Sequence, residues 1–195
     1  PEASTREKAD AAGEAALALA GSSDADRRAA LHAVADALEA NVDRVLAANE
    51  EDVAAAEELL AAGEYSRALV DRLELSPEKV TDIAEMVRSV AGQDDPLGRT
   101  QAARRLDDGL ELYRVSTPIG VVGAIFESRP DALVQIAALA LRSGNAVILK
   151  GGSEASASNR VLFEIIREAA ADHAPDGRAQ LVEARGAGDP PPGVA

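Results

Sequence analysis

The sequence of 195 residues contains no cysteine, and this absence excludes several kinds of chemistry at once. A chain without thiols forms no disulfide framework, no zinc–thiolate centre and no thiol nucleophile of its own. Aromatic residues make up only 2% of the chain, so it offers few rings on which nucleic-acid bases could stack. The hydrophobic share of 47%, in contrast, is ample for a folded core.

Positive charge and long apolar runs are also scarce. The chain has 34 acidic and 20 basic side chains, a net charge of −14. Such a chain repels nucleic acid and anionic lipid, so we expect neither as a partner. No apolar run approaches the roughly 20 residues that span a bilayer, and residues 1–4 do not resemble the start of a secretory signal. We therefore expect a cytoplasmic protein.

The acidic excess belongs to the first half of the chain. Residues 1–100 hold 22 acidic and 10 basic side chains, a balance of −12, whereas residues 101–195 hold 12 and 10, a balance of −2. Two explanations remain open: a surface adapted to high salt, or a compositional bias whose charges lie on solvated helix faces. Both concern the environment of the protein and not its chemistry.

Residues 5–92 have the pattern of helix throughout, and we expect a helical first part over residues 1–103. Apolar side chains recur there at spacings of three, four and seven, with acidic residues on the opposite face. Ser23 can cap one helix, and Ser76 followed by Pro77 is typical of the start of another. A segment rich in turn-forming residues then ends the helical region.

The period of the pattern changes after residue 103. Residues 104–116 alternate around an Asp-Gly pair, which predicts a β-hairpin. Residues 117–184 predict strand, helix, strand, helix and strand, as in a doubly wound parallel sheet. The first of these strands, residues 119–126, is almost entirely apolar, so we expect it to be buried on both faces. Residues 185–195 are rich in proline and glycine and predict a disordered tail.

The loop after the second predicted strand is the stronger candidate site, because ligands bind beyond the carboxyl ends of parallel strands. Lys150 supplies a positive charge there, and Gly151 and Gly152 let the backbone approach a ligand closely. Ser153 can cap the next helix, whose start we expect to present free amides to an anion. The alternative is an ordinary turn with a capping serine and a solvated lysine. The spacing matches neither standard phosphate-binding glycine motif.

The loop after the first strand, residues 127–131, is the second candidate. Arg129 could clamp a carboxylate or phosphate, and Ser128 could donate to a carbonyl oxygen. The alternative is an exposed arginine with Ser128 as a helix cap. His32, in an apolar helical stretch, and His173 have no carboxylate at ligand spacing, so no metal site is predicted and both are interpreted as structural.

The two loops together resemble a known family. Residues 118–130 read PIGVVGAIFESRP, and residues 141–155 read LRSGNAVILKGGSEA. These segments, above all ESRP and KGGSEA, are similar to the gamma-glutamyl phosphate reductases, also called glutamate-5-semialdehyde dehydrogenases. This family is a branch of the aldehyde dehydrogenase superfamily, and the resemblance covers residues 1 to about 184.

The resemblance implies an α/β, aldehyde dehydrogenase-like fold: N-terminal helices, a hairpin that serves oligomerisation, and an incomplete Rossmann-like βαβ sheet for the cofactor. The activity it implies is reduction of L-glutamyl 5-phosphate by NADPH in proline biosynthesis, through a cysteine thiolate that attacks the acyl phosphate. Ser128 and Arg129 would lie near the substrate. Ser153 stands where many NAD-dependent members carry a glutamate that binds the ribose, which favours NADP. The implied cofactor-binding residues are Lys150, Gly151, Gly152, Ser153 and Glu154.

The chain departs from this family because it lacks the catalytic cysteine. Members are longer, with the cysteine and most of the substrate domain beyond position 195, which suggests a truncation, a frameshift or a fragment. We expect the 195-residue chain alone to be inactive and the full-length protein to be a homo-oligomer. The alternative is a non-catalytic nucleotide-binding or helical interaction module derived from an aldehyde dehydrogenase.

Overall fold

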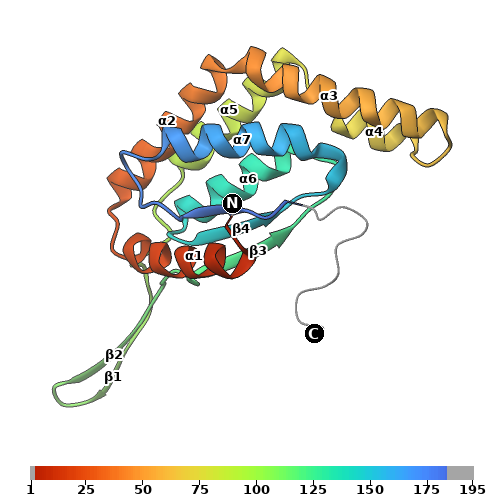
Figure 1. The fold of residues 1–195 in the computed structure, drawn as a ribbon. Helices are drawn as coiled ribbons and strands as arrows, with labels where there is room; N and C mark the ends of the chain where they lie inside the picture. The colour runs from red at the N-terminus through yellow and green to blue at the C-terminus, as the bar shows by residue number, and fades with distance from the viewer. Residues whose placement is uncertain (1–2, 184–195) are drawn as a thin grey trace, which may run out of the picture.

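The computed structural model describes residues 3–183, and the predicted tail at 185–195 lies outside these described residues. A three-stranded parallel sheet forms the centre of the molecule (Figure 1). Helix α1 packs on one face of the sheet, helices α6 and α7 cover the other, and the remaining helices form a further layer over α6 and α7. A two-stranded hairpin projects from the body.

The first part is helical, as predicted, and is divided into five helices. Ser23 caps α2 by accepting a hydrogen bond from Asp26 N, and Ser76 caps α5 in the same way from Lys79 N. Among the described residues, no helix is both long and apolar enough to cross a bilayer. The five helices are α1 (Thr5–Ala20), α2 (Asp24–Ala40), α3 (Val42–Ala61), α4 (Arg67–Leu73) and α5 (Pro77–Gly92).

The hairpin is formed by β1 (Thr100–Asp107) and β2 (Leu110–Val115), which pair antiparallel. Gly109 has a φ of 76°, a left-handed conformation that glycine adopts without strain. The hairpin begins four residues earlier than the predicted residue 104. Residues 100–103 lack the alternation that marks a strand, and pairing with β2 extends β1 over them.

The second part contains the predicted βαβ units, in the strand order β3-β4-β5 with all strands parallel. β4 is largely buried, but the expectation that the first strand is buried on both faces is wrong. In β3, Ile125 is 80% exposed and Val121 38% exposed. The reason is that β3 is an edge of the described sheet and α1 packs chiefly over β4. The elements are β3 (Val121–Ile125), α6 (Pro130–Arg142), β4 (Ala146–Lys150), a 3₁₀ turn η1 (Ser153–Ala155), α7 (Ser156–Ala169) and β5 (Ala179–Leu181).

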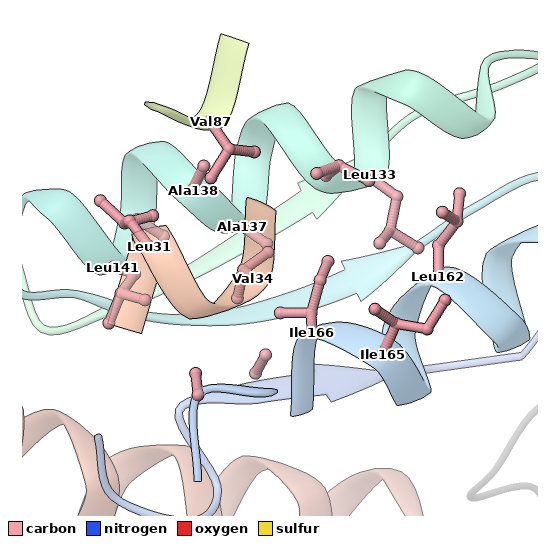
Figure 2. Close-up of a cluster of buried hydrophobic side chains, with 14 of the residues drawn as sticks. Leu31, Val34, Val87, Leu133, Ala137, Ala138, Leu141, Leu162, Ile165 and Ile166 are labelled. Carbon is pink, nitrogen blue, oxygen red and sulfur yellow. The ribbon is translucent and has the colours of Figure 1, made fainter. Parts of the chain in front are cut away.

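The main core lies between the sheet and the helical layers, and it joins the two halves of the chain. Figure 2 shows side chains from α2 and α5 meeting side chains from α6 and α7 in one apolar cluster. Burial of this kind stabilises the fold by roughly 25 cal/mol per Å² of apolar surface. The N-terminal helices are therefore part of the same folding unit as the sheet. The cluster includes Leu31, Val34, Val87, Leu133, Leu141, Leu162, Ile165 and Ile166.

Candidate functional site

The two predicted site loops meet at one edge of the sheet. Strands β3 and β4 are parallel and Ile125 pairs with Lys150, so the loops that follow them start side by side. The backbone N–H of Phe126 donates to the carbonyl oxygen of Lys150 at 3.1 Å, which extends this pairing into the β3–α6 loop (residues 126–129). The carboxyl edge therefore brings Ser128 close to the β4–α7 loop (residues 151–155).

Glu154 joins these two loops directly. Its Oε1 accepts the backbone N–H of Ser128 at 2.5 Å and the Ser128 hydroxyl at 3.0 Å. Ser128 is 8% exposed and has a φ of 51°, a left-handed conformation that costs an L-residue on the order of 1 kcal/mol. The alternative that Ser128 caps a helix is wrong, because Arg129 is the N-cap residue of α6 and the Ser128 hydroxyl donates to Glu154.

The two glycines of the β4–α7 loop lie against the polar ends of neighbouring side chains. A Cβ on Gly151 would lie 2.3 Å from Nδ2 of Asn159, and one on Gly152 would lie 2.2 Å from both carboxylate oxygens of Glu154. Separations below 3 Å force a neighbouring group to move. Gly152 thus leaves the space in which the Glu154 side chain turns toward Ser128.

The start of α7 does not offer the free amides that we expected. Asp52, on α3, accepts the backbone N–H of Ala157 at 3.1 Å and of Ser158 at 2.7 Å. A carboxylate at a helix N-terminus is stabilised by the helix dipole and satisfies amides that an anionic ligand would otherwise bind. The predicted cap is wrong as well, since Ser153 is exposed and begins η1, while α7 begins three residues later.

Asn49 extends this polar network one turn away on α3. Its Nδ2 donates to the carbonyl oxygen of Leu73 at 2.9 Å and to the Ser158 hydroxyl at 3.1 Å, and its Oδ1 accepts the N–H of Leu75 at 2.7 Å. Ala155 of η1 is buried in a small apolar cluster with residues of α3 and α4. The helical half therefore holds the β4–α7 loop in place, through residues for which the sequence contains no local signal.

Lys150, half-buried at the end of β4, keeps an available positive charge beside this loop. Within residues 3–183 its ammonium group has no hydrogen bond or ion pair to another side chain or carbonyl. A small cavity of about 10 Å³ lies at this loop, lined by the loop glycines, the start of α7 and the end of β5. Asn159 in this lining is 3% exposed, and its Oδ1 accepts no hydrogen bond from the described residues.

Arg129 lies on the other side of its loop, in a groove of about 570 Å³ between α4, α5 and α6. Asp131 accepts a hydrogen bond from Arg129 at 2.6 Å and thereby raises the pKa of the guanidinium above its usual value. The groove has an apolar floor of Leu75, Ile83 and Met86 and a rim of both charge signs. The rim residues are Asp71, Arg72, Glu74, Lys79, Asp82, Arg129 and Asp131.

The two histidines lie away from these loops. His32 is exposed on α2, although it lies in an apolar stretch of the sequence, and His173 is exposed after α7. Between residues 3 and 183 the structure contains no group of three or more histidine, aspartate or glutamate side chains that could hold a metal ion.

The carboxyl edge of a parallel sheet is where α/β proteins bind ligands, and here it carries a lysine and a glycine loop. Residues 2–189 match the model of the aldehyde dehydrogenase family, and the chain belongs to that family.

Within this family the chain is similar to gamma-glutamyl phosphate reductases. It is 70% identical to the enzyme of Natronomonas pharaonis, over 93% of this chain and 41% of that protein. It is 63% identical to that of Haloquadratum walsbyi, over 92% of this chain and 39% of that protein. The chain thus spans about two fifths of the length of these curated relatives.

Solved structures of gamma-glutamyl phosphate reductases also match this chain. The crystal structure of gamma-glutamyl phosphate reductase from Saccharomyces cerevisiae matches with a TM-score of 0.86 and 36% identity, over 94% of this chain and 47% of that one. The enzyme from Thermotoga maritima matches with a TM-score of 0.85 and 34% identity, over 91% and 42%. The resemblance inferred from ESRP and KGGSEA is confirmed, and so is the aldehyde dehydrogenase-like α/β fold.

Proposed function

We propose that this chain is the N-terminal, cofactor-binding part of an NADPH-dependent reductase that converts L-glutamyl 5-phosphate to L-glutamate 5-semialdehyde and phosphate. The observation that carries this proposal is the 70% identity to a gamma-glutamyl phosphate reductase over 93% of the chain. The two site loops lie within the residues that match the family, at the carboxyl edge of the sheet.

The residues of the β4–α7 edge fit the adenosine end of a nicotinamide cofactor. Lys150 offers a charge that the described residues leave available for a ribose hydroxyl or a phosphate. Ser153 is exposed and uncharged, so it does not repel a 2′-phosphate, and the Glu154 carboxylate is hydrogen-bonded to Ser128. This arrangement favours NADP over NAD. When bound, the nicotinamide supplies the hydride for the reduction.

The groove beside Arg129 suits the other reactant. L-glutamyl 5-phosphate carries an amino group, a carboxylate and an acyl phosphate, and the groove rim offers cations and carboxylates above an apolar floor. Arg129 can form a bidentate pair with a carboxylate or phosphate if it exchanges Asp131 for the substrate. The Ser128 hydroxyl lies at the same loop and can donate to a carbonyl oxygen if it releases Glu154, to which it donates in this structure.

The chemical step needs a nucleophile from elsewhere, because a chain without cysteine has no thiolate to attack an acyl phosphate. We propose that the thiol belongs to the part of the reductase that the relatives have and this chain does not. The 195-residue chain alone then binds cofactor and does not turn over substrate. We further propose that the complete protein is a homo-oligomer assembled through the exposed hairpin.

Binding of the two reduced cofactors to the 195-residue chain tests this function. The chain has no tryptophan, so the fluorescence of bound NADPH or NADH is read without protein background from that residue. NADPH is expected to bind more tightly than NADH, and Lys150→Ala should abolish that binding. Arg104→Ala, an exposed hairpin variant that removes the same charge, should leave it unchanged. Equal binding of NADPH and NADH by the parent chain would refute the assignment.

A further inference from the structure

The carboxylate of Glu154 is the link between the loop proposed to hold the cofactor and the loop proposed to face the substrate. It belongs to η1 in the β4–α7 loop, yet it accepts two hydrogen bonds from Ser128 in the β3–α6 loop. We propose that Glu154 is a positioning residue that transmits the conformation of residues 150–154 to Ser128 and Arg129. This inference rests on the proposed function, which assigns the β4–α7 loop to the cofactor and the β3–α6 loop to the substrate.

The position of Glu154 is itself well determined. On its C-terminal side Ala155 is buried among residues of α3 and α4, and Asp52 and Asn49 hold the start of α7. On its N-terminal side Gly152 has no Cβ, and a Cβ there would lie 2.2 Å from both carboxylate oxygens of Glu154. The backbone of Glu154 is therefore held in place, and a movement of the β4–α7 loop would move its carboxylate relative to Ser128.

Ser128 depends on that partner for its own conformation. Its left-handed backbone is unfavourable for a residue with a Cβ, and its amide donates to the half-buried carboxylate of Glu154. Without an acceptor at Glu154, the amide loses a charge-assisted hydrogen bond and the backbone is free to relax. Because Arg129 is the next residue and lines the groove, such a relaxation redirects its guanidinium.

Two substitutions at different residues should therefore both weaken the interaction between Glu154 and Ser128. Glu154→Ala removes the acceptor, and Gly152→Ala places a methyl group where the carboxylate lies. Glu154→Gln keeps one oxygen as acceptor and should restore part of the interaction. Matched controls are Glu127→Ala, which removes an exposed charge beside Ser128, and Gly92→Ala, which adds a methyl group where no atom lies within 4 Å.

Amide hydrogen exchange at Ser128, followed by NMR in the 195-residue chain, measures the interaction. Exchange at Ser128 should be at least about tenfold faster in Glu154→Ala and Gly152→Ala than in the parent and both controls. Exchange at Leu149 in the central strand should stay unchanged, which shows that the fold is intact. Unchanged exchange at Ser128 in both variants would overturn the proposal.

Addition of NADPH separates this inference from the proposed function. NADPH bound at residues 150–153 should slow Ser128 exchange in the parent chain and not in Glu154→Ala. If NADPH binds in preference to NADH but leaves Ser128 unaffected in the parent, the coupling is wrong and the proposed function stands. If NADPH does not bind, the proposed function fails, and the exchange rates of the variants decide the role of Glu154 alone.

Discussion

The carboxylate of Asp52 accepts the backbone N–H of Ser158 at 2.7 Å, although the two residues are 106 positions apart in the chain. This contact joins α3 of the helical half to the first turn of α7 in the sheet half. It also places a fixed negative charge where a phosphate would bind in many nucleotide enzymes. Under the function that we propose, an anionic cofactor therefore depends on Lys150 and the loop backbone, and not on the start of α7.

Asp52→Ala should lower the free energy of unfolding by about 1 to 2 kcal/mol, because two amides at a helix start lose their acceptor. Asp52→Asn keeps one oxygen acceptor and should cost less. Urea-induced unfolding measures both. Glu50→Ala, an exposed change on the same helix, serves as control. A cost for Asp52→Ala no larger than that of the control would show that the contact contributes nothing.

The ion pairs of Asp24 should make the free energy of unfolding depend on pH in the acidic range. Hydrogen bonds from Arg142 and Arg28 hold the pKa of Asp24 below its ordinary value. The folded state therefore takes up this proton less readily than the unfolded state. The stabilising contribution is complete above the unfolded pKa of about 4 and is lost as the pH falls through the lower folded pKa.

Asp24→Asn should thus be less stable than the parent at neutral pH, and the difference should narrow as the pH falls below about 4. Unfolding midpoints in urea, measured for both proteins across this range, provide the comparison. The buried side chain of Arg142 makes the neutral-pH loss larger than that of an exposed ion pair. A difference that stays constant with pH would contradict the assigned cause of the shift.

The excess of acidic side chains predicts a dependence on salt. Screening of the net charge of −14 should raise the urea midpoint as the salt concentration increases, since the repulsion is concentrated in residues 1–100. Replacing Glu50 and Glu51 together with glutamine should reduce this slope. A midpoint independent of salt would show that repulsion among these carboxylates does not limit stability.

Local patterns predicted the elements well, because their causes are local. The Ser76 cap and the Asp-Gly turn act within four residues, and both are present as predicted. The exposure of β3 was missed because an apolar run cannot show whether another element covers it. The partners of Glu154 and Asp52 were missed for a related reason: each contact depends on how distant segments pack, and no spacing in the sequence records it.

The hairpin supplies a test of assembly. Leu110, Leu112 and Tyr113 are each more than half exposed, which is a surface that another subunit can cover. We expect Leu112→Lys to shift a full-length protein containing this chain toward monomer in sedimentation experiments. Arg104→Lys, which preserves charge on the same hairpin, should not do so. An unchanged oligomer in Leu112→Lys would exclude the hairpin as the assembly element.

The most direct measurement joins residues 1–183 to the remainder of the Natronomonas pharaonis reductase, which is 70% identical over the aligned part. Reduction of L-glutamyl 5-phosphate by NADPH is then compared between this hybrid and the 195-residue chain. The account predicts turnover by the hybrid, loss of NADPH affinity in its Lys150→Ala form, and no turnover by the chain alone. Turnover by the chain alone, or a folded hybrid that binds NADPH without reducing the acyl phosphate, would contradict it.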